Sequence, residues 1–198
     1  MKKYILDKSF YFIKKYSSFK DKELDKIKYG LEGIYLTLSK LIIISFISIY
    51  LGIFKELLIF ILFFSIIRMF AFGLHFSSSF ICLIASLFIF LLFSFYATII
   101  NIPLFIKTII GILCFIFIFI YAPADTLKRP LINNNKRTIY KYVASFISFI
   151  YILIIVFINN NFISNILLFS LTTEVIMIMP ITYQLFKMPY NNYKVYRN

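Results

Sequence analysis

The residues best suited to covalent chemistry lie in one short stretch of the chain. It contains His75, the only histidine among 198 residues, and Cys82, one of two cysteines. An imidazole can take the proton of a thiol, and the thiolate that results is a nucleophile. The pair therefore suggests nucleophilic catalysis. The alternative is structural, because a lone cysteine often packs as an inert apolar group and a histidine can be an interfacial polar residue.

The spacing of His75 and Cys82 requires a bend between them. Positions seven apart on one helix share a face but lie about 10.5 Å apart along the axis, whereas a hydrogen bond spans about 3 Å. Gly73 and the serines at 77–79 suit a bend, because glycine tolerates turns and serine caps helix starts. With Ser78 or the next serine as N-cap, Cys82 falls in the first turn of a new helix, whose dipole favours a thiolate. Bending or oxyanion donation are alternative roles for the serines, and we favour capping.

The composition of the chain predicts an all-α, polytopic membrane protein. Hydrophobic residues make up 62% of the sequence and aromatic residues 21%, whereas a soluble domain is roughly 45–50% apolar. The formal net charge is +13, from 21 Lys and Arg against 8 Asp and Glu. The basic residues flank apolar runs, which favours cytoplasmic loops and anionic lipids as partners over nucleic acid.

About six transmembrane helices are expected, because six apolar runs approach the length of about 20 residues that a bilayer requires. Residues 1–31 are basic with apolar residues at helical spacing, which predicts an amphipathic helix on the cytoplasmic face. Residues 32–186 would form the transmembrane domain and 187–198 a cytoplasmic tail. A re-entrant element between the second and third runs is an alternative. The runs are roughly 34–53, 56–74, 79–100, 103–121, 143–159 and 163–184.

Lys and Arg gather in residues 1–31, in the polar stretch 122–142 and in the tail. The positive-inside rule then places both termini, that loop and the turn bearing His75 at the cytoplasmic face. Thiols stay reduced there. Two cysteines define no disulfide framework, and Cys114 is expected to serve packing. We expect neither a metal nor a cofactor.

Charged side chains near or within the predicted spans are further candidates. Lys40 and Glu174 are expected to face the bundle interior, where Glu174 would pair with Lys40 or line a substrate cavity. Arg68 could hold a substrate carboxylate, stabilise the thiolate or anchor the span at the cytoplasmic face. Asp125 could orient His75 as a third catalytic member, although a turn role is the interpretation we favour.

The stretch around His75 resembles the active-site segment of the accessory gene regulator B (AgrB) family. That family's pattern is an Arg, three residues, two Gly, one residue, a His, six residues and a Cys. Arg68, Gly73, His75 and Cys82 match it, whereas Phe72 replaces the first Gly.

Two further motifs extend the resemblance over essentially the whole chain. Residues 29–32 (Tyr-Gly-Leu-Glu) precede the first apolar run, and residues 121–126 (Tyr-Ala-Pro-Ala-Asp-Thr) resemble the family's central loop. Glu32, Lys128 and Arg129 thereby become candidates for substrate binding or support. The basic loop is either a cytoplasmic anchor or a dock for an acidic peptide tail.

The resemblance implies a homodimeric cysteine endopeptidase of the bacterial cell membrane that acts in quorum sensing. His75 would be the general base for Cys82, which would cleave the C-terminal tail from an AgrD-like pro-peptide. The acyl-enzyme thioester would then yield a cyclic thiolactone or lactone. Two rival hypotheses are a small transporter that uses Lys40 and Glu174, and a scaffold in which His75 and Cys82 are incidental.

Overall fold

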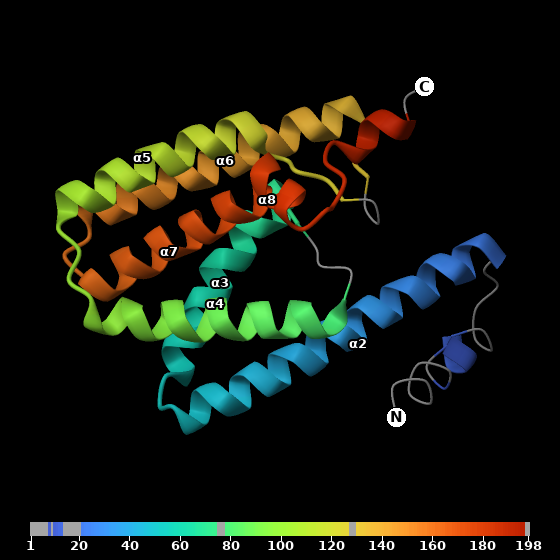
Figure 1. The fold of residues 1–198 in the computed structure, drawn as a ribbon, viewed down its shortest axis with the longest axis horizontal. Helices are drawn as coiled ribbons and strands as arrows, with labels where there is room; N and C mark the ends of the chain where they lie inside the picture. Colours follow the sequence, from blue (N-terminus) through green and yellow to red (C-terminus); the bar gives the residue numbers. More distant parts are fainter. Residues whose placement is uncertain (1–7, 9, 14–20, 75–77, 127–129, 197–198) are drawn as a thin grey trace. The chain divides into compact units, whose positions relative to one another are not determined.

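The computed structural model of the chain is helical and divides into two compact units, Met1–Tyr50 and Leu51–Asn198 (Figure 1). The two units are described separately below. The described residues are 8, 10–13, 21–74, 78–126 and 130–196.

The first unit is dominated by one long helix, α2 (Asp21–Tyr50). This helix passes without interruption through residues 31 and 32, where the sequence placed the boundary between an amphipathic segment and the first span. Its part Gly30–Tyr50 is long and apolar enough to cross a membrane. Gly30 and Gly33 do not end the helix, since glycine lowers helix stability by only about 1 kcal/mol relative to alanine.

The described residues of the second unit form a bundle of five longer helices followed by two short ones. In Figure 1, α5, α6 and α7 run side by side, and α4 also contacts α7. The helices are α3 (Phe54–Ala71), α4 (Ser79–Ile99), α5 (Leu104–Tyr121), α6 (Asn134–Phe157), α7 (Asn161–Ile178), α8 (Pro180–Leu185) and the 3₁₀ helix η1 (Asn192–Tyr196).

Most predicted breaks between spans are confirmed, and two boundaries are wrong. The helix α6 begins at Asn134 instead of near residue 143, because the Asn133 side chain accepts the Lys136 N–H at 3.2 Å and so caps a polar first turn. The last predicted run, 163–184, is split, since α7 ends before Pro180, which cannot continue a helix.

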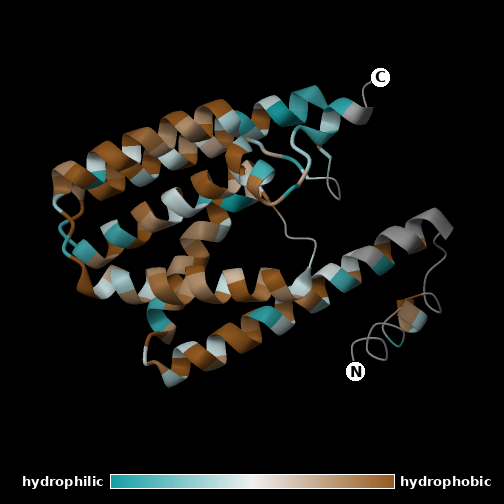
Figure 2. Cartoon of the chain, viewed as in Figure 1, coloured by the Kyte–Doolittle hydropathy of each residue, from teal (hydrophilic) through white to brown (hydrophobic). Residues whose placement is uncertain are grey.

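Within the described residues, five helices are long and apolar enough to span a membrane, against about six expected. These are the apolar part of α2 together with α4, α5, α6 and α7. The 18-residue α3 is not among them because it carries Lys55, Glu56 and Arg68. Apolar residues cover most of α4 and α5 (Figure 2), so the prediction of an all-α, multi-pass membrane protein is confirmed.

The helix α7 lies at the centre of the second unit. It contacts α3, α4, α5, α6 and α8, and 61% of it is buried. Its buried face is partly polar, and Ser170 and Thr173 satisfy their hydroxyls on carbonyls of the preceding turn at 2.8 and 2.7 Å. Cys114 on α5 is buried in the same core, which confirms its predicted packing role.

Candidate functional site

Three loops meet at one end of the second unit, and backbone hydrogen bonds join them. The Gly73 N–H donates to the Ala124 carbonyl at 2.8 Å, and the Ala124 N–H donates to the Ala71 carbonyl at 2.9 Å. The Leu74 N–H donates to the Met177 carbonyl at 2.8 Å. The segment that leads into His75 is therefore fixed both to the 122–125 loop and to the end of α7.

The junction of these three loops, called the crossing below, requires unusual backbone conformations at two consecutive residues. Phe72 has φ 62° and ψ −125°, and Gly73 has φ 108°. Only glycine adopts such angles without strain, so the backbone at Phe72 is strained. The ring of Phe72 is buried and lies 5.5 Å from the ring of Tyr140, and this packing offsets the strain.

Gly73 has no room for a side chain. A Cβ atom there would lie 2.9 Å from the Met177 carbonyl oxygen and would collide with the Arg68 guanidinium. Glycine is thus required at this position for both its φ angle and its close contacts.

Arg68, in the last turn of α3, connects this crossing to α7. One guanidinium nitrogen, Nη1, lies 3.5 Å from both carboxylate oxygens of Glu174, and the other, Nη2, donates to the Leu74 carbonyl at 2.7 Å. Glu174 is fully buried, whereas 22% of the Arg68 side chain is exposed. From the sequence, we expected Glu174 to pair with Lys40 or to line a substrate cavity, and in the structure its carboxylate pairs with Arg68.

The predicted nucleophile lies where the sequence placed it relative to the helix start. Ser78 is the N-cap of α4, and the Cys82 N–H donates to its carbonyl at 3.0 Å. Cys82 is half-buried in the first turn of α4. The Ser78 hydroxyl makes no capping hydrogen bond, so the capping role is confirmed for its backbone position and is wrong for its side chain.

Three of the predicted site residues, His75, Lys128 and Arg129, lie outside the described residues. Leu74, directly before His75, is buried and fixed by the contacts described above. Glu32 lies half-buried on α2 in the first unit.

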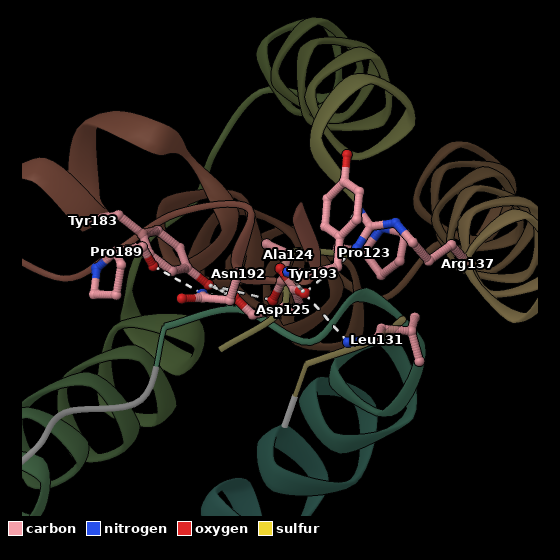
Figure 3. Close-up of polar contacts among 9 residues, drawn as sticks. All are labelled: Pro123, Ala124, Asp125, Leu131, Arg137, Tyr183, Pro189, Asn192 and Tyr193. Carbon is pink, nitrogen blue, oxygen red and sulfur yellow. Dashed lines mark hydrogen bonds and ion pairs between the residues drawn. The ribbon is translucent and has the colours of Figure 1, made fainter. Parts of the chain in front are cut away.

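Asp125 anchors the C-terminal segment to the central loop (Figure 3). Its buried carboxylate accepts the N–H of Tyr193 at 2.8 Å and that of Leu131 at 3.2 Å, both at Oδ2. The same oxygen lies 3.6 Å from Nη1 of Arg137, whose guanidinium covers the Tyr193 ring at 3.6 Å from its centroid. These contacts support the turn role that we favoured, and Oδ1 has no hydrogen-bond partner among the described residues.

Sequence reasoning missed two residues that complete this anchor. The backbone carbonyl of Asp125 accepts from the Asn192 side chain at 3.2 Å. The Tyr183 hydroxyl donates to the Ala124 carbonyl at 3.2 Å, with the Asp125 carbonyl 3.4 Å away (Figure 3). Burial raises the pKa of Tyr183, which keeps the hydroxyl protonated and able to donate. The cluster of Asn and Tyr at 190–193 was the available signal, since such residues pair readily with backbone groups.

Among the described residues, no three His, Cys, Asp or Glu side chains come together in a way that could hold a metal ion.

Comparison with known proteins places the chain in one family. The model of the family "Accessory gene regulator B" matches residues 6–178. A putative AgrB-like protein of Clostridium acetobutylicum is 33% identical over 171 residues, 86% of this chain and 82% of that protein. A putative AgrB-like protein of Listeria innocua is 32% identical over 173 residues, 86% of this chain and 84% of that protein.

A third relative is the accessory gene regulator protein B of Staphylococcus carnosus. It is 33% identical over 137 residues, which cover 69% of this chain and 71% of that protein. No solved structure matches the chain. With a family match over most of its length, the chain belongs to the accessory gene regulator B family.

Proposed function

We propose that the chain is a membrane-embedded cysteine endopeptidase in which His75 is the general base for Cys82. The observation that carries the proposal is the interruption of the helix between Ala71 and Ser79. Residues seven apart on one continuous helix would lie about 10.5 Å apart along its axis, and Cys82 lies on a new helix that begins only at Ser79. The interruption also places Cys82 in the first turn of α4, where the helix dipole favours a thiolate.

The reaction begins with proton transfer from the Cys82 thiol to the His75 imidazole. The thiolate attacks the carbonyl carbon of the scissile peptide bond, and the C–N bond breaks as the imidazolium returns the proton to the leaving amine. The released product is the C-terminal tail of an AgrD-like pro-peptide, and the remaining peptide is bound to Cys82 as a thioester.

A Cys or Ser side chain of the bound peptide then attacks the thioester. This step releases the Cys82 thiol and closes a thiolactone or lactone ring. Apolar surroundings keep bulk water from the thioester, which favours ring closure over hydrolysis. The cyclic product would serve quorum sensing, which accords with membership of the accessory gene regulator B family.

Arg68 and Glu174 act here as positioning residues. The buried Glu174 carboxylate holds the guanidinium, and the guanidinium holds the Leu74 carbonyl directly before His75. We propose this role for Arg68 over binding of a substrate carboxylate, stabilisation of the thiolate or membrane anchoring, and for Glu174 over a role in transport.

The same proposal sets the location and the partners. In this proposal α3 is a sixth membrane-spanning helix, because the residues at its end hydrogen-bond to Ala124 after α5 and to Met177 at the end of α7. Both termini and the 122–142 loop then face the cytoplasm of a bacterial cell, as the distribution of Lys and Arg favours. The enzyme works as a homodimer, and Glu32, Lys128 and Arg129 contact the pro-peptide.

Co-expression with an AgrD-like pro-peptide tests the proposal, with the peptide followed by mass spectrometry. The wild type should remove the tail, and His75→Ala and Cys82→Ala should not. Cys114→Ala is the matched control, because it removes the other thiol, which is buried on α5. A thioester adduct on Cys82 would identify the nucleophile.

Two outcomes would count against the proposal. Tail removal by both His75→Ala and Cys82→Ala would make the pair structural and turn attention to the transporter hypothesis. Exclusive formation of a linear, hydrolysed peptide by the wild type would refute the cyclisation step while leaving the peptidase intact.

A further inference from the structure

A pocket of about 480 Å³ opens beside the Asp125 anchor, at the same end of the second unit. Its walls are the end of α5 at Ile120 and Tyr121, the start of the 122–125 loop, the first two turns of α6, and the C-terminal segment at 190–193. The end of α5 and the start of α6 are also the ends of two candidate membrane spans. The pocket therefore lies where a span meets the polar region of a bilayer.

The electrostatic character of this pocket is positive. Arg137 and Lys141 line it, and none of its lining residues in the described chain is acidic. The first turn of α6 contains no acidic residue, so the positive end of its dipole at Asn134 is not offset there. An anionic group is the ligand that such a pocket favours.

The side chains of Arg137 and Lys141 differ in the contacts that the protein makes with their charged groups. Arg137 pairs with Asp125 at 3.6 Å, donates to the Pro123 carbonyl at 3.4 Å and stacks on Tyr193, so its position is fixed and a carboxylate faces its charge, although its buried Nη1 has no hydrogen-bond partner among the described residues. The Lys141 ammonium lies 4.6 Å from the centroid of the Phe119 ring and has no carboxylate partner among the described residues. Lys141 thus supplies the charge that is available to a ligand.

The surroundings of the pocket favour a lipid over a soluble anion or an acidic peptide. Phe119, Ile120 and Tyr142, on the two helices that form the pocket, are 42%, 55% and 61% exposed. This apolar surface next to Lys141 can hold acyl chains while the pocket holds a phosphate. Basic pockets between transmembrane helices bind anionic headgroups in this way.

From these features we infer that the pocket is a binding site for the headgroup of an anionic phospholipid, with Lys141 as its main charged contact. Cys82 does not line this pocket, and lipid binding there does not require the proposed peptidase activity. A basic membrane protein attracts anionic lipids in general, and this pocket is a defined position on the fold where one would bind.

Native mass spectrometry of the purified full-length protein can test this inference, with phosphatidylglycerol and phosphatidylcholine of identical acyl chains as probes. Wild type should bind phosphatidylglycerol more tightly than phosphatidylcholine. Lys141→Gln should weaken phosphatidylglycerol binding about five-fold, the effect expected for one lysine near a membrane surface, and Lys141→Arg should retain it. The matched control is Lys136→Gln, which removes the same charge from an exposed position of α6 outside the pocket.

Several results would overturn the inference. Equal losses in Lys141→Gln and Lys136→Gln would indicate a diffuse surface effect, and equal binding of the two lipids would exclude headgroup recognition. Inorganic phosphate that binds as tightly as phosphatidylglycerol would make the pocket a site for free phosphate. A short oligoglutamate peptide could also displace the bound lipid. If the protein without this peptide then showed no preference for phosphatidylglycerol over phosphatidylcholine, the pocket would be assigned to an acidic peptide. Circular dichroism of each variant verifies that its helices are intact.

Discussion

Replacement of Arg68 by Gln should destabilise the second unit more than replacement of Glu174 by Gln. The first substitution leaves a fully buried carboxylate without its partner, and removal of one member of a buried ion pair costs about 3–5 kcal/mol. The second leaves a guanidinium that is 22% exposed and can still reach water. The new amide oxygen can also accept from Nη1, so about 1–2 kcal/mol is expected.

The double substitution should cost less than the sum of the two single ones. Two neutral amides leave no buried charge, and residues in direct contact show coupling of about 0.5–3 kcal/mol. Thermal unfolding in detergent, followed by circular dichroism, measures these differences. At about 2–4 °C per kcal/mol for a chain of this size, Arg68→Gln should lower the Tm by about 6–20 °C and Glu174→Gln by about 2–8 °C.

Lys55→Gln provides the matched control, because it removes a positive charge from an exposed position on the same helix. Its Tm should stay close to that of the wild type. Additive effects of the two single substitutions, or a larger loss from Glu174→Gln than from Arg68→Gln, would refute the reasoning about burial.

Three further predictions concern the loops around the site. Gly73→Ala should cost about 1–3 kcal/mol from its φ of 108° alone, with more from the clash, whereas Gly33→Ala, which has open space, should leave the Tm unchanged or raise it. Asp125→Asn should weaken the contact with the Tyr193 N–H and speed limited proteolysis of the C-terminal segment, and an unchanged cleavage rate would contradict the anchor. Burial raises the pKa of Tyr183, so above about pH 10 the unfolded state ionises first. Stability should therefore fall as the pH rises further, and this fall should be smaller in Tyr183→Phe.

The helix boundaries were predictable where local residues decide them. Gly52, Pro103 and the asparagines at 159–161 mark breaks because glycine, proline and asparagine disfavour continued helix. The start of α6 was misplaced because its first turns are polar and were interpreted as loop, although Asn133 is a typical N-cap residue. The division of the last run at Pro180 was also visible in the sequence, but the apolar residues on both sides obscured it.

The candidate site was predictable only in its local part. The position of Cys82 in a first turn followed from serine preferences at N-caps. The partner of Glu174 could not be predicted, because Arg68 lies 106 residues away and helical periodicity gives a face but no partner. The contact of Tyr193 with Asp125 spans 68 residues and depends on the chain returning after α8, which no local pattern encodes.

The central position of α7 links these separate contacts to the proposed chemistry. Glu174 and the Met177 carbonyl, both on α7, hold Arg68 and Leu74, and thereby fix the chain directly before His75. The helix α4, which carries Cys82, packs against the same α7. The chain directly before His75 and the helix that carries Cys82 are thus both held by α7, the first through Arg68 and Leu74 and the second through packing of α4. It follows that a substitution in the core of α7 should impair peptide processing at a distance, by changing the separation of base and nucleophile while both remain intact.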